Sequence, residues 1–238
     1  MAARRTTPRR DRGPVEPNPP VLATELDDVV LDLHDPSDLR NARITEVVGE
    51  GDIDDLEVIG CTLEGVALTA VSARRLRLTD VVLRGCELSG IDLTEARFRR
   101  VRLEGCRAAM LDVGMAAIED LVVVDCKLTE AGLRMATIER SRFEGCDMVA
   151  AELGGARLDA VTFDGCDLRG ADVAGASLQA VRFPRSTLDE LRGAPSLAGA
   201  SVDPAQVLPV ALALFGALGI GLEDPEAELG AVTGADQR

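Results

Sequence analysis

The residues with the greatest potential for chemistry are six cysteines in a chain of 238 residues. Five of them recur at every twentieth position, at Cys86, Cys106, Cys126, Cys146 and Cys166. Thiols in such a series could form disulfides, bind a metal ion or act as nucleophiles. The sequence contains no Cys-x-x-Cys pair, and the chain is larger than the small secreted domains that disulfides stabilise. The pattern therefore favours free thiols that pack as small apolar side chains.

The single histidine, His34, lies in the polar stretch His-Asp-Pro-Ser-Asp. It has no second histidine for a metal site, and with Asp35 it would still need a positioned nucleophile to form a catalytic triad. We interpret it as a turn or cap residue. The acidic residues could form acid–base pairs, but no Walker loop, Gly-x-Ser-x-Gly motif or Rossmann fingerprint accompanies them. The sequence predicts a protein that is not an enzyme and that uses no cofactor and no metal.

A pentapeptide repeat determines which elements carry these side chains. Residues 61–190 divide into 26 consecutive pentapeptides without an insertion. The third residue is apolar in all 26, and the first is Cys, Ala, Val, Leu, Ile or Ser. The resulting spacing of 2, 3, 2, 3 fits neither a strand nor a helix. Two inward side chains followed by an exposed corner predict a turn in every pentapeptide.

A second, longer period of four pentapeptides lies on top of the first. Besides the cysteines, it relates Phe143, Phe163 and Phe183. Four pentapeptides should therefore form one coil, with equivalent residues stacked about 4.8 Å apart in a rod of roughly 31 Å. Cysteines in such a column point the same way, which suits neither a disulfide nor a tetrahedral metal site. The apolar third residues fill the interior and leave no lumen for a substrate.

The pentapeptides IDLTE, AELGG, CDLRG and ADVAG match the consensus A(D/N)LXX, so the chain resembles the pentapeptide-repeat family. The resemblance implies an all-β fold, a right-handed quadrilateral β-helix with a C-terminal α-helix. It is similar to the fluoroquinolone-resistance members, which implies binding to DNA gyrase or another type II topoisomerase as a DNA mimic and resistance to topoisomerase poisons. The alternative is a general protein-interaction scaffold.

The segments outside the repeat receive separate assignments. Residues 1–20 contain five arginines and no apolar run, which predicts a disordered basic arm in a cytoplasmic protein. Residues 21–60 carry 12 acidic residues against two arginines, a net charge of −10, and are expected to form an acidic N-terminal cap of degenerate coils with slips in register. The β-helix itself is assigned to residues 61–200.

The C-terminal part is expected to be a helix over residues 201–222, followed by a flexible tail over residues 223–238. The Asp203-Pro204 pair predicts a helix start, and Gly219 with Gly221 predicts its end. Pro209 and the glycines argue against a membrane span. The helix either caps a monomer or joins a homodimer, and the resemblance favours the dimer. The expected dimer contacts are Leu208, Leu212, Phe215 and Leu218.

The formal net charge is −15, which argues against direct binding to nucleic acid. Residues 61–200 hold 21 acidic and 18 basic residues, a net charge of only −3. The repeat faces are therefore close to neutral, which weakens DNA mimicry by the rod itself. One basic corner, at Arg97, Arg99, Arg100 and Arg102, could dock an acidic protein or could simply be solvated and paired with Glu95 and Glu104.

Overall fold

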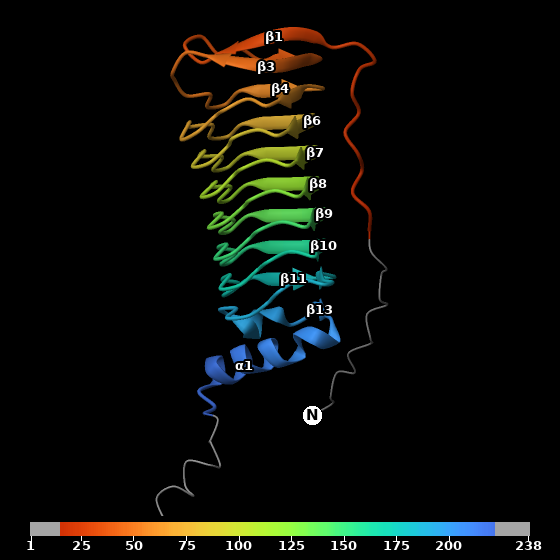
Figure 1. Ribbon diagram of the computed structural model, residues 1–238, viewed down its shortest axis with the longest axis vertical. Coiled ribbons are helices and arrows are strands. Elements are labelled where there is room, and N and C mark those ends of the chain that lie inside the picture. Colours follow the sequence, from red (N-terminus) through yellow and green to blue (C-terminus); the bar gives the residue numbers. More distant parts are fainter. Residues whose placement is uncertain (1–14, 222–238) are drawn as a thin grey trace, which may run out of the picture.

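The computed structural model describes residues 15–221, which form a rod of stacked coils ending in a single α-helix (Figure 1). One parallel sheet follows the rod in the order β1-β3-β5-β6-β7-β8-β9-β10-β12-β13, with β2, β4 and β11 pairing beside this path. This is the stack of coils that the repeat predicts, and it has the β-helix and C-terminal helix that the family resemblance implies. The central strands, one in each coil, are β6 (Arg77–Arg84), β7 (Arg97–Glu104), β8 (Ala117–Val124), β9 (Thr137–Glu144) and β10 (Arg157–Asp164).

Each coil has four sides, and every side pairs with the equivalent side of the next coil. In one coil the four pairs are Ala67 with Glu87, Ser72 with Asp92, Arg77 with Arg97, and Val82 with Arg102. Successive pairs thus lie one pentapeptide apart along the chain, and the two members of each pair lie four pentapeptides apart. The coil of four pentapeptides predicted from the sequence is confirmed.

The corners between the sides depend on a left-handed backbone. The fifth residue of all 26 pentapeptides between 61 and 190 has a positive φ, although only nine of these residues are glycine. At two of the four corners a hydrogen bond closes the turn, as from Leu76 N to Ala73 O at 3.3 Å and from Ile91 N to Leu88 O at 3.2 Å. A positive φ at the third position of such a turn is the geometry of a type II turn.

The interior is filled by columns of apolar side chains from the first and third repeat positions. Phe143, Phe163 and Phe183 stack with ring centroids 4.9 and 5.3 Å apart and with their planes tilted by 14° and 8°. Ser141 is buried in the same core, where its hydroxyl donates to Glu139 O at 2.8 Å. The inward positions therefore accept a polar group only where the backbone can bond it.

The N-terminal end of the rod is built by β1 (Asp27–Asp32), β2 (Leu39–Arg40), β3 (Ala42–Val48), β4 (Glu57–Ile59) and β5 (Thr62–Glu64). Here the coils are shorter, since the pairs Leu39 with Val58 and Arg43 with Thr62 fall one position short of the regular offset. The regular offset is reached where Glu57 pairs with Arg77. The regular pairing thus begins before the first complete pentapeptide at residue 61.

Residues 15–20 correct the assignment of residues 1–20 to a disordered arm. They run in extended form along the outside of the coils, back from β1 toward the C-terminal end (Figure 1). Asn18 donates to Asp120, and Glu16 pairs with Arg142 at 3.2 Å. These partners are distant in the sequence, so the composition of the arm could not reveal them. The rest of the predicted arm lies outside the described residues.

At the C-terminal end, β11 (Ser177–Gln179) and β12 (Arg182–Phe183) are followed by η1 (Ala194–Leu197), β13 (Ser201–Val202) and η2 (Pro204–Gln206). Gln206 is buried, and its amide donates to Phe183 O at 2.6 Å and Ser186 O at 2.5 Å. Gln206 thereby donates hydrogen bonds to two carbonyls that would otherwise accept them from a further coil.

Helix α1 (Val207–Leu218) crosses the end of the rod and stops at Gly219, whose φ is 69° (Figure 1). The helix expected over residues 201–222 is therefore too long at both ends. Ser201 and Val202 still pair with β12, because the last coil offers them a strand edge, and Gly219 ends the helix in the left-handed conformation. The predicted tail over residues 223–238 lies outside the described residues.

The left-handed corners generate a prediction about stability. Gly165 has φ 62° with open space where a Cβ would stand, so Gly165→Ala should lower the free energy of unfolding by about 1 kcal/mol through the backbone alone. Ala150, with φ 57°, offers the matched reversal, and Ala150→Gly should raise it by a similar amount. Urea titrations followed by circular dichroism measure both changes, and the same sign for the two variants would contradict the corner geometry.

Candidate protein-interaction surfaces

Helix α1 presents an apolar stripe to solvent. The predicted contacts Leu208, Leu212, Phe215 and Leu218 are 68%, 44%, 37% and 67% exposed. Their spacing of four, three and three positions places them along one side of the helix. Val210 instead packs against the core of the rod. The structure therefore brings the four predicted residues together at one end of the molecule, where the described chain leaves them uncovered.

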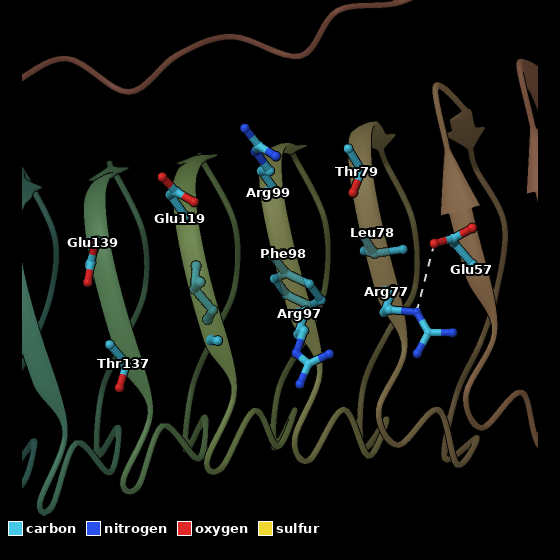
Figure 2. A pocket seen from close by; sticks show the side chains of 12 residues that line it. Glu57, Arg77, Leu78, Thr79, Arg97, Phe98, Arg99, Glu119, Thr137 and Glu139 are labelled. Atoms are coloured by element: carbon cyan, nitrogen blue, oxygen red, sulfur yellow. Dashed lines mark ion pairs between the residues drawn. The ribbon is translucent and has the colours of Figure 1, made fainter.

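A shallow groove of about 360 Å³ follows the outer face of β4, β6, β7, β8 and β9. Figure 2 shows Arg77, Arg97 and Arg99 projecting outward from neighbouring coils, with Glu119 and Glu139 beyond them. Ala117 and Thr137 continue the column of Arg97 toward β9, and their short side chains leave open the space of the groove. The groove has a basic half on β6 and β7 and an acidic half on β8 and β9.

The basic corner predicted from the sequence separates into two kinds of arginine. Arg100 bonds both carboxylate oxygens of Asp80, at 2.6 and 2.5 Å, and Arg102 pairs with Glu104 at 2.5 Å. The guanidinium groups of Arg97 and Arg99 make no hydrogen bond or ion pair with any residue that the structure describes. The two arginines of this set without a partner therefore line the groove, whereas the corner itself is neutralised, with Asp80 rather than the expected Glu95 as the partner of Arg100.

Ion pairs between coils neutralise much of the remaining surface. Arg84 contacts Glu64 at 3.5 Å and Glu104 at 2.9 Å, in the coils on either side of it. Arg134 reaches Glu152 in the next coil at 2.7 Å. Hydrogen bonds from Arg102 and Arg84 hold the pKa of Glu104 below its usual range, and the bond from Arg134 lowers the pKa of Glu152. Opposite charges thus alternate along the column of Glu64, Arg84 and Glu104, which leaves no continuous negative stripe there.

The six cysteines and His34, the residues with the greatest potential for chemistry, do not form a common site. All six cysteines are buried, as expected of thiols that pack as small apolar groups, and desolvation raises the pKa of the Cys61 thiol. His34 is exposed in the turn after β1, with Asp32 Oδ1 3.2 Å from its Nδ1. Among residues 15–221, no group of three or more His, Cys, Asp or Glu side chains could hold a metal ion. No helix in the same range is long and apolar enough to cross a membrane.

One column of ion pairs was not predicted from the sequence. Asp80, Arg100, Asp120 and Arg140 occupy one corner of four successive coils, and the charges alternate along it. Arg140 pairs with Asp120 at 3.2 Å, as Arg100 does with Asp80. The longer period of the sequence contains this signal, since these four residues share one repeat position. Their contact with residues 15–21 has no comparable signal in the sequence.

Comparison of the sequence with protein families gives two matches, both to pentapeptide repeats. A profile of eight pentapeptide-repeat copies matches residues 77–108, and a pentapeptide repeat region profile matches residues 124–192. The first match falls inside the 26 pentapeptides and the second extends two residues past them, and together they include β6, β7, β9 and β10 in full. No curated protein matches the chain.

Solved pentapeptide-repeat structures align with most of the chain at low similarity. HetL, involved in heterocyst differentiation regulation in the cyanobacterium Nostoc sp. strain PCC 7120, is 20% identical over 78% of this chain and 91% of its own, with a TM-score of 0.35. A trypsin-treated QnrB1 variant, a plasmid-mediated fluoroquinolone resistance protein, is 19% identical over 84% of this chain and 100% of its own, with a TM-score of 0.39. The relationship is defined by the repeat itself rather than by these superpositions.

Proposed function

Because the chain is a pentapeptide-repeat protein, we propose that it is a non-enzymatic rod that binds other proteins and that α1 joins two copies into a homodimer. The observation that carries the proposal is the exposed apolar stripe on α1. A soluble monomer rarely leaves such a contiguous apolar patch uncovered. The packed interior, in which Phe163 and Leu168 are almost fully buried, supports a role through the outer surface.

A second copy is the occupant that fits this stripe. Leu208 to Leu218 form a single line, so two antiparallel helices related by a twofold axis would each bring the same residues to the contact. The described part of α1 carries no charged residue that would oppose this pairing. The contact would place two rods end to end, with their β1 ends pointing away from each other (Figure 1).

For the partner, we propose a type II topoisomerase such as DNA gyrase, bound through the acidic β1 end of the rod. Residues 21–60 carry a net charge of −10, against −3 for residues 61–200. Asp27, Asp28 and Asp32 are exposed on β1, at the end that α1 leaves open. A basic surface made to receive DNA is complementary to such a concentration of carboxylates. The proposal thus confines DNA mimicry to the ends of the dimer and places the protein in the cytoplasm.

The general scaffold is the second candidate, and the groove of Figure 2 favours it. Arg97 and Arg99 offer positive charge, which no DNA mimic needs and which an acidic protein segment would match. A partner of this kind would lie along the face of β6 and β7 rather than at the end of the rod.

The dimer predicts a specific response to substitution in α1. Leu212→Glu with Phe215→Glu should convert a dimer into a monomer in sedimentation equilibrium at micromolar protein, since two carboxylates from each copy would be buried unpaired at the contact. Met135→Glu is the matched control, because Met135 is also an exposed apolar residue but lies on a corner of the rod. A wild-type protein that sediments as a monomer at this concentration would rule out the dimer.

The topoisomerase proposal predicts an effect in a gyrase supercoiling assay run with and without a quinolone. Wild-type protein at micromolar concentration should inhibit supercoiling or protect the enzyme from the drug. Asp27→Asn with Asp28→Asn should weaken the effect at least fivefold, whereas Asp189→Asn with Glu190→Gln, an equal change of charge near the other end, should leave it unchanged. If wild-type protein neither inhibits nor protects, the partner is not gyrase and the scaffold is the better account.

A further inference from the structure

Residues 15–21 lie across the corner of the rod formed by Asp80, Arg100, Asp120 and Arg140. The backbone N–H and the side-chain amide of Asn18 both donate to Asp120, each at 3.1 Å, and the backbone N–H of Val21 donates to Asp80 at 2.8 Å. Figure 1 shows the segment running along the coils, and Figure 2 shows it passing above the faces of β6, β7 and β8. One short segment thus contacts coils that are distant from it in sequence.

The contact is unusually buried for a corner. Corner residues project outward, and Met115 and Met135 at another corner are 57% and 65% exposed. Asp80 and Asp120 are only 8% and 3% exposed. A charged side chain at that depth requires partners for its oxygens, and these come from Arg100 and Arg140 within the column and from residues 18 and 21 of the segment.

The spacing of the donors matches the spacing of the acceptors. The segment reads Glu-Pro-Asn-Pro-Pro-Val, and its prolines favour a polyproline II helix, which rises about 3.1 Å per residue and leaves its own N–H groups without internal bonds. Asn18 and Val21 are three residues, hence about 9.3 Å, apart. Asp120 and Asp80 are two coils, hence about 9.6 Å, apart. A donor on every third residue therefore meets a carboxylate on every second coil.

The period of three also decides which residues face the rod. Pro17 and Pro20, one turn apart in a polyproline II helix, are half-buried, whereas Val21 is exposed. The hydrogen bond from Arg100, together with that from Val21, keeps the pKa of Asp80 below its usual range, so the acceptor is charged at neutral pH. Because each aspartate is already balanced by an arginine, the corner selects a ligand for its N–H donors rather than for positive charge.

We propose that this corner is a binding site for proline-rich segments in the polyproline II conformation, and that residues 15–21 fill it as a displaceable strap. The ligand class is an extended peptide with prolines three residues apart and N–H donors at the same period. The bound strap acts as an internal competitor, because a tethered segment reaches an effective concentration in the millimolar range. The site does not depend on the dimer or on the topoisomerase proposal.

A peptide-binding experiment on the full chain tests the site. The probe is a fluorescein-labelled peptide with the sequence of residues 15–22, Val-Glu-Pro-Asn-Pro-Pro-Val-Leu, followed by fluorescence anisotropy. The strap is weakened in the intact protein by Pro17→Gly, Asn18→Ala and Pro20→Gly. We expect the peptide to bind this strap variant at least tenfold more tightly than wild-type protein, since the internal competitor is lost. A peptide carrying the same three substitutions should not bind.

Substitutions in the corner separate the site from non-specific binding. In the strap variant, Asp120→Asn and Asp80→Asn should each weaken the peptide at least fivefold, because a charged acceptor is replaced by a neutral one. Asp159→Asn, which changes an exposed carboxylate outside the corner, should have no effect. Melting curves show whether each variant is folded. Two corner variants are used so that the test still stands if one of them does not fold.

Hydrogen exchange supplies the independent readout of the strap. The amides of Asn18 and Val21 should be protected in wild-type protein and should exchange at least tenfold faster in the strap variant. The proposal is overturned if these amides are unprotected in the wild type, or if the strap variant releases them and still does not bind the peptide. Equal binding by wild-type protein and the strap variant, or binding insensitive to both corner aspartates, would overturn it as well.

Discussion

Backbone hydrogen bonds between successive coils hold the rod together, and they form only while each coil keeps a length of four pentapeptides. The amide of Arg77 donates to Leu56 O at 2.9 Å, that of Arg97 to Leu76 O at 2.8 Å, and that of Ala117 to Ala96 O at 2.9 Å. An inserted residue would shift every inward side chain beyond it to the wrong position. The constraint also explains why most of the left-handed corners are not glycine, since the chain must turn at each fifth residue whatever its type.

The same constraint means that each end of the rod needs hydrogen-bond partners other than a neighbouring coil. A coil in the middle has a neighbour on each side, but the last coil must find other partners for its carbonyls, and Gln206 supplies them. Helix α1 covers this end and leaves its outer stripe exposed, and it is there that we propose a second copy. The other end carries the carboxylates of β1, and the strap reaches from it back across β6, β8 and β9.

The sequence predicts the core of this structure because the core is periodic. Each inward residue, such as Cys106 or Phe163, has its environment fixed by the residues four pentapeptides before and after it. The α1 stripe was predictable for a related reason, since a helix apolar on every side cannot bury all of itself against the end of a rod. Residues 15–20 were assigned wrongly because composition describes a segment in isolation, whereas their order comes from contacts with Asp120 and Arg142. The longer period places Asp80 and Arg100 at one repeat position, but whether Arg100 bonds Asp80 or Glu95 depends on side-chain geometry that the period does not give.

Distances between spin labels on one column test the register of the coils most directly. Ala67, Asp147 and Asp167 occupy the same outward position in different coils, and the native cysteines are buried away from the label. Pulsed electron paramagnetic resonance on cysteine pairs should give about 19 Å between positions 67 and 147, four coils apart, and about 24 Å between 67 and 167, five coils apart. Separations that do not grow by about 4.8 Å for each added coil would contradict the account.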